Sequence, residues 1–157
     1  MKSMFTLFAW SALAFPLIAQ GEEVADKGKD EKALHANWLA TTAEISGKKL
    51  PEEVLKTWKL TLTENKYTFK TVGEADEGTW TLVENKEKSD EAKKYKAMDI
   101  KGGDAGPNKG KTFLCIYDLK GDTLTVCYDL TGKERPTEFK TKPDTKLFLV
   151  TYKREKP

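Results

Sequence analysis

Histidine and cysteine are scarce in this chain of 157 residues, which holds one histidine, His35, and two cysteines, Cys115 and Cys127. A zinc site gathers His, Cys and carboxylate ligands, and a Ser-His-Asp triad needs a histidine between its partners. His35 has no second histidine or cysteine beside it, so we expect a solvated side chain at the start of the folded region. The carboxylates lie in turns, without the burial that raises a catalytic pKa. We therefore expect no metal site, no cofactor and no enzymatic activity.

Blocks of one charge sign are also absent from the sequence. The chain has 27 Lys and Arg residues against 25 Asp and Glu residues, and the two signs alternate along its whole length. A nucleic-acid-binding protein concentrates basic residues on one face or segment. The sequence therefore predicts a solvated charged exterior and no nucleic-acid partner.

Long apolar runs are limited to residues 4–18, which follow Lys2 and precede the small residue Ala19. A basic start, a short apolar run and a small residue are typical of a secretory signal peptide. The run is shorter than the roughly 20 residues that span a bilayer. We expect residues 1–19 to be a cleaved signal, the protein to be periplasmic or secreted, and no stable membrane insertion afterwards. A retained N-terminal anchor is the alternative.

The remaining sequence predicts a charged, flexible leader at residues 20–33 and one all-β domain at residues 34–157. The leader lacks an apolar period. In the domain, apolar and polar residues alternate over short segments separated by turns, with a single helical turn at residues 51–56. The expected strands are residues 38–45, 58–63, 67–72, 79–83, 97–100, 112–119, 123–129, 137–141 and 146–153. Such spacing is typical of an antiparallel barrel or sandwich.

Two hairpins follow from this alternation. A turn at Asn65-Lys66 would set Leu62 opposite Phe69, with both side chains on one face. A turn at Gly121-Asp122 would set three apolar pairs on one face: Leu119 with Leu124, Tyr117 with Val126, and Cys115 with Tyr128.

The second hairpin also bears on the two cysteines, which an exported chain would by default pair. In the expected register Cys127 faces away from Cys115, and thiols on opposite faces cannot reach disulfide geometry. We therefore favour free thiols. A three-residue loop would instead place Cys115 opposite Cys127.

Strand phase predicts one inward apolar set for the domain. An eight-stranded barrel has an interior that side chains fill or that holds one small ligand. We take this set as the candidate ligand-binding residues, and complete filling of the core is the alternative. Its members are Trp58, Leu60, Leu62, Phe69, Trp80, Leu82, Met98, Ile100, Tyr117, Val126 and Tyr128.

Several strings resemble an uncharacterised lipocalin-like domain family that is abundant in planctomycete bacteria. They are Leu50-Pro-Glu-Glu, Gly106-Pro-Asn-Lys-Gly-Lys-Thr112, Ile116-Tyr-Asp-Leu-Lys-Gly-Asp-Thr-Leu124 and Gly132-Lys-Glu-Arg-Pro-Thr-Glu-Phe139. The resemblance implies a small antiparallel, calycin-type barrel of about eight strands. In lipocalins a first-strand Gly-x-Trp is covered by a basic residue of the last strand. Here Ala36 replaces the glycine, and the resemblance implies that Arg154 stacks on Trp38 as a structural latch.

Two functions are compatible with these features. The first is an extracytoplasmic lipocalin-like binding module that holds a small hydrophobic ligand in the barrel. The second is a solid-cored barrel that acts as a protein-interaction or envelope-associated module through its charged loops at residues 84–94 and 102–111.

Overall fold

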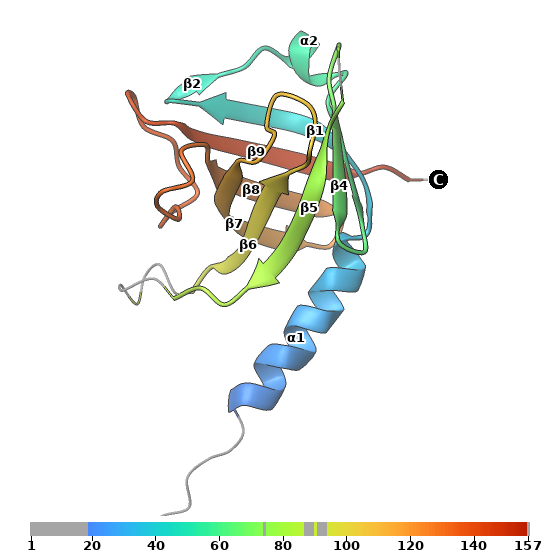
Figure 1. The fold of residues 1–157 in the computed structure, drawn as a ribbon, viewed down its shortest axis with the longest axis vertical. Coiled ribbons are helices and arrows are strands. Elements are labelled where there is room, and N and C mark those ends of the chain that lie inside the picture. Colours follow the sequence, from blue (N-terminus) through green and yellow to red (C-terminus); the bar gives the residue numbers. More distant parts are fainter. Residues whose placement is uncertain (1–18, 74, 87–89, 91–93, 157) are drawn as a thin grey trace, which may run out of the picture.

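Alternating side chains build an antiparallel barrel in the computed structural model, which describes residues 19–73, 75–86, 90 and 94–156 (Figure 1). The predicted signal peptide lies outside these residues, apart from Ala19. The strands of the described chain are β1 Ala36–Ile45, β2 Lys48–Lys49, β3 Lys59–Thr63, β4 Lys66–Lys70, β5 Asp76–Val83, β6 Lys96–Gly102, β7 Thr112–Lys120, β8 Thr123–Asp129 and β9 Leu147–Arg154.

The barrel closes because β1 pairs with β3 on one side and with β9 on the other. From β3 to β9 each strand pairs with its neighbour in the sequence, and the short β2 adds a hairpin to β1. The predicted all-β barrel of about eight strands is confirmed, with one extra short strand.

The strand predicted at residues 137–141 is wrong, because no strand is formed there. Asp129 turns the chain after β8 by accepting hydrogen bonds from the backbone N–H groups of Thr131, Lys133 and Glu134. Pro136, which is buried, and Pro143 flank the predicted strand, and proline has no N–H to donate to a ladder. The segment instead anchors to the outside of the sheet, where the Arg135 guanidinium donates to the carbonyls of β6 and β7.

The predicted β7–β8 register is confirmed, and the β3–β4 register is wrong by two residues. Cys115 lies opposite Tyr128 and Leu119 lies opposite Leu124, as predicted. In the first hairpin Leu62 lies opposite Tyr67 rather than Phe69, which pairs with Leu60. The turn therefore uses Glu64 and Asn65 instead of Asn65 and Lys66. A shift of two residues keeps every side chain on its predicted face.

Both cysteines are free and fully buried on opposite faces of the sheet. Cys115 belongs to the barrel core, whereas Cys127 pairs with the outward-facing Ile116. Thr141 and Pro136 of the outer segment are buried as well, so this segment shields part of the outer face of the barrel.

The flexible leader predicted at residues 20–33 is replaced by helix α1, Ala19–Leu34, which leaves one end of the barrel (Figure 1). Its sequence is rich in Ala, Glu and Lys, which favour helix even without an apolar face. Contacts of the last turns fix it, since Leu34 is fully buried and Asp30 is nearly so. The predicted helical turn is present as α2, Glu52–Leu55, at the opposite end. No helix of the described chain has the length and apolar composition needed to cross a membrane.

Candidate functional site

The barrel interior near α1 is filled by side chains. Trp38, Met98, Val126 and Leu34 expose 1% or less of their surface, and Trp80 exposes 2%. Trp80 also donates its indole N–H to the Thr63 carbonyl at 2.9 Å. The interior around these residues is therefore a packed core.

Trp38 and Arg154 close this end, in the arrangement that the resemblance implies. The Arg154 guanidinium lies 4.4 Å from the centroid of the Trp38 ring. Trp38 Nε1 donates to the Leu34 carbonyl at 2.9 Å, and Arg154 Nη2 donates to the Ala33 carbonyl at 2.8 Å. Both carbonyls belong to the last turn of α1. Carbonyls in the last turn of a helix have no intrahelical N–H partner. The stacked pair therefore also fastens the helix to the barrel.

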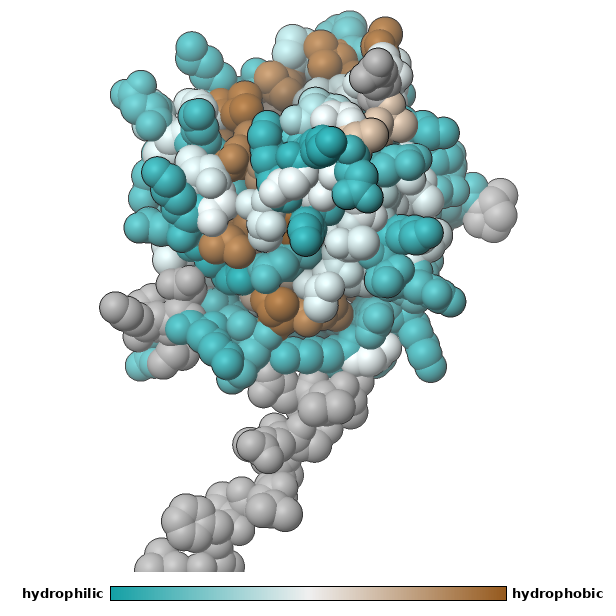
Figure 2. All heavy atoms as spheres, in the orientation of Figure 1, coloured by the Kyte–Doolittle hydropathy of each residue, from teal (hydrophilic) through white to brown (hydrophobic). Residues whose placement is uncertain are grey.

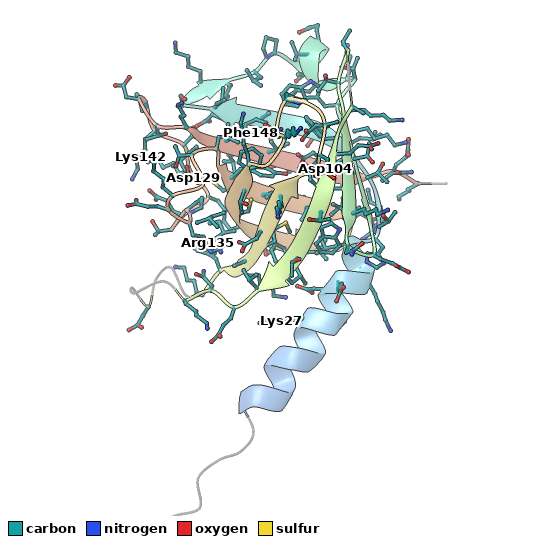
Figure 3. The ribbon with its side chains drawn as sticks, viewed as in Figure 1. Lys27, Asp104, Asp129, Arg135, Lys142 and Phe148 are labelled. Atoms are coloured by element: carbon teal, nitrogen blue, oxygen red, sulfur yellow. The ribbon has the colours of Figure 1, made fainter. Side chains whose placement is uncertain are left out.

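The opposite end of the barrel contains a cavity of about 110 Å³. Phe69, Tyr128 and Phe148 contribute aromatic rings to its wall: Phe148 stacks on the buried Tyr128, and Trp58 contacts Phe69 and Phe148 edge to face from outside the lining. Figure 3 shows Phe148 at this end of the barrel, away from Lys27 on α1. The cavity is lined by Leu60, Tyr67, Phe69, Asp76, Ile100, Asn108, Phe113, Tyr128, Leu130, Phe148 and Tyr152.

Polar groups are few in this cavity, and they form two small networks. Tyr67 Oη and Asn108 Nδ2 each donate to Asp76 Oδ2 at 2.8 Å. The hydroxyls of Tyr128 and Tyr152 lie 3.1 Å apart. Burial raises the pKa of Tyr67, and its hydrogen bond to Asp76 raises it further, so the phenol stays protonated as a donor.

Asp76 is the one carboxylate among the lining residues of this cavity. Its side chain comes from the first residue of β5, and the residue is 7% exposed. Although Oδ2 accepts two hydrogen bonds, Oδ1 is buried and has no hydrogen-bond partner. The cavity thus combines apolar walls with one incompletely satisfied anionic group.

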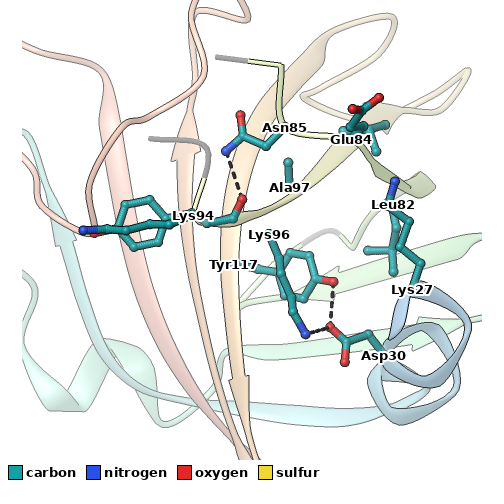
Figure 4. A pocket seen from close by; sticks show the side chains of 11 residues that line it. Lys27, Asp30, Leu82, Glu84, Asn85, Lys94, Lys96, Ala97 and Tyr117 are labelled. Atoms are coloured by element: carbon teal, nitrogen blue, oxygen red, sulfur yellow. Dashed lines mark hydrogen bonds and ion pairs between the residues drawn. The ribbon is translucent and has the colours of Figure 1, made fainter. Parts of the chain in front are cut away.

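A second pocket, of about 360 Å³, lies beside α1 and has more polar walls (Figure 4). Asp30 Oδ2 accepts hydrogen bonds from Lys96 Nζ at 2.7 Å and from Tyr117 Oη at 2.9 Å. These contacts join α1 to β6 and β7. We interpret this pocket as the junction between the helix and the barrel, because its central polar groups bind one another.

The structure divides the predicted site residues among these places. Leu60, Phe69, Ile100 and Tyr128 line the 110 Å³ cavity. Leu82 and Tyr117 line the pocket beside α1. Leu62, Trp80, Met98, Val126 and Trp58 belong to or pack against the hydrophobic core.

The prediction missed seven lining residues of this cavity: Tyr67, Asp76, Phe113, Leu130, Phe148, Tyr152 and the loop residue Asn108. Strand phase contains a signal for three of them, since Tyr67 is in phase with Phe69, Asp76 with Trp80, and Phe113 with Tyr117. An aspartate at an inward position is itself unusual. No pattern in the sequence indicates that the β6–β7 loop brings Asn108 to the same place.

His35 is less solvated than predicted, because it packs edge-on against Trp80 with 5.9 Å between ring centroids. Its Nε2 atom is buried and has no hydrogen-bond partner. Within the described residues, no three His, Cys, Asp or Glu side chains are placed to hold a metal ion.

Comparisons with protein-family models, with curated proteins and with solved structures find no match to this chain.

Proposed function

We propose that this protein is a binding module that holds one small ligand in the cavity opposite α1. The cavity itself carries the proposal. The interior around Trp80 and Met98 is packed, whereas at this end eleven residues line about 110 Å³ of space. An apolar cavity of about 150 Å³ is large enough to bind benzene. Because this cavity is smaller, the expected ligand has at most about six non-hydrogen atoms and a mainly apolar body.

The alternative is a solid-cored barrel that acts on a protein partner through its loops. The packed interior near α1 favours this function, but the β6–β7 loop does not. This loop folds back on the barrel, where Gly103 N–H donates to the Glu77 carbonyl and Asn108 reaches Asp76. Part of the other loop, residues 84–94, lies outside the described residues. The visible face in Figure 2 is mostly hydrophilic, with its apolar residues in small separate areas.

We also propose that the protein is exported, that it acts without catalysis, and that it is a member of the lipocalin-like family that its sequence resembles. Cleavage after Ala19 would leave nearly all of α1 as the mature N-terminus. Mass spectrometry of the protein from the periplasm or medium of a secreting host tests this. A mature mass beginning at Gln20 supports export with cleavage, and an intact residue 1 in the membrane fraction contradicts it.

The binding function is tested by NMR titration of methyl resonances with isopentanol, which has six non-hydrogen atoms. We expect saturable shifts at Leu60 and Ile100, which line the cavity, and little change at Met98. Leu130→Phe adds volume at the cavity wall and should weaken binding. Leu39→Phe makes the same change at an exposed outer position (39% exposed) and should leave binding intact. Wild-type protein without saturable shifts would refute the proposal.

A further inference from the structure

We infer that the cavity selects a small ligand with a cationic amine, and that Asp76 is its counter-ion. The inference rests on the proposed function and adds to it the chemistry of the ligand's polar group. The starting observation is the carboxylate of Asp76, which is 93% buried at the cavity wall.

The immediate partners of Asp76 do not neutralise its charge. Tyr67 and Asn108 are neutral donors, and both bind Oδ2. No lysine or arginine of the described residues forms an ion pair with Asp76. A buried carboxylate without a cation is costly unless hydrogen bonds satisfy it, and here Oδ1 accepts none.

The β6–β7 loop passes close to this oxygen without supplying a donor to it. Gly106 has a φ of 88°, and a Cβ atom built on it would lie 3.5 Å from Asp76 Oδ1. A glycine at this position therefore keeps side-chain atoms away from the unpaired oxygen. An ammonium group supplies both a positive charge and N–H donors, which a carboxylate accepts in strong charge-assisted hydrogen bonds.

The walls of the cavity fix the remainder of the ligand. Leu60, Ile100 and Phe113 are apolar and buried, so they favour an alkyl or ring body attached to the amine. A ligand carboxylate is disfavoured, since like charges repel at a desolvated site. The expected class is a primary amine with a short apolar tail.

The test compares isopentylamine with isopentanol at pH 7, where the amine is protonated. The two molecules share their carbon skeleton and differ in the charge of the polar group. We expect wild-type protein to bind the amine about tenfold or more tightly than the alcohol. Asp76→Asn should abolish this preference. Asp104→Asn removes an exposed charge from the β6–β7 loop. This control variant should keep the preference for the amine.

The outcomes separate this inference from the proposed function. Equal binding of both molecules by wild-type protein would overturn the amine selectivity and leave ligand binding standing. A preference that persists in Asp76→Asn would also overturn it. Binding of neither molecule would overturn both proposals.

A second measurement covers the case in which Asp76→Asn does not fold. In wild-type protein the side-chain amide resonances of Asn108, which donates to Asp76, should shift with isopentylamine and shift much less with isopentanol. Equal shifts with the two molecules would contradict the inference.

Discussion

At the scale of single residues, Arg154 joins three parts of the molecule. Its guanidinium stacks on Trp38, donates to the Ala33 carbonyl of α1 and pairs with Asp122 at 3.1 Å. A planar, delocalised cation suits stacking and fixed donors together, and an ammonium does not.

We expect Arg154→Ala to lower the free energy of unfolding by about 1–3 kcal/mol, because it removes the stacking and both hydrogen bonds. Arg154→Lys should recover only part of this loss. Urea denaturation measures both, with Lys156→Ala as a control at a nearby exposed lysine. Full recovery by lysine would mean that charge alone matters.

The cysteines give a second prediction at this scale. Burial raises the pKa of Cys127 to about 12 and the pKa of Cys115 well above its usual range. Because the thiolate is the reactive form, the folded protein should not react with a thiol reagent at pH 8. The denatured protein should react at two thiols. Rapid labelling of folded protein, or no labelling after denaturation without reductant, would contradict the structure.

At the scale of elements, α1 depends on tertiary contacts rather than on its own sequence pattern. The carboxylate of Asp30 is the centre of these contacts, since it accepts from both Tyr117 and Lys96. Nothing in residues 20–33 marks this aspartate as different from its charged neighbours. The helix could therefore not be recognised from apolar periodicity.

A double-mutant cycle tests this attachment. Asp30→Asn and Tyr117→Phe should each lower the free energy of unfolding by about 1–2 kcal/mol. The double variant should lose less than the two together, because both changes break the same hydrogen bond. Strict additivity in thermal or urea denaturation would contradict the contact.

The segment after β8 depends on Asp129 and gives a pH-dependent prediction. Burial raises the pKa of Asp129, but hydrogen bonds from Glu134, Thr131 and Lys133 lower it by more, and the folded-state pKa lies below 3.8. The stabilisation is therefore present above the unfolded-state pKa and is lost as the pH falls through the folded-state value.

Asp129→Asn should accordingly destabilise the protein at pH 7 by about 1–3 kcal/mol, with a smaller difference from wild type at pH 3. Denaturation curves at several pH values measure this, with the exposed Asp104→Asn as the control. A difference that stays constant with pH would show that the charge of Asp129 is not involved.

The strands illustrate what alternation can and cannot predict. The hairpin around Gly121 was predictable in detail, because a glycine turn fixed both phase and register. In the hairpin around Asn65 the turn has no glycine, and only the phase was correct. Residues 137–141 alternate like a strand, yet they lie between two prolines and contact the outside of a sheet that is already closed.

At the scale of the whole molecule, the sequence predicted which side chains face inward. It did not predict which of them pack in the core and which line the cavity. Phase places Trp80 and Ile100 on the same interior surface, but one belongs to the packed half and the other lines the cavity. That difference depends on the bulk of Trp38 at one end and on how the β6–β7 loop covers the other. Neither the effect of Trp38 nor the position of the loop follows from the alternation of apolar and polar residues along single strands.

The central claim is that, within the described residues, the end of the barrel opposite α1 contains a cavity, whereas the interior around Trp80 and Met98 is packed. A crystal soaked in 1-bromobutane tests it directly, because anomalous scattering locates the bromine. We predict one strong peak between Ile100, Phe113 and Tyr128, and none beside Trp80 or Met98. A crystal soaked at saturating 1-bromobutane that shows no bromine in this cavity, or bromine only on the outer surface, would contradict the claim of a ligand-accessible cavity.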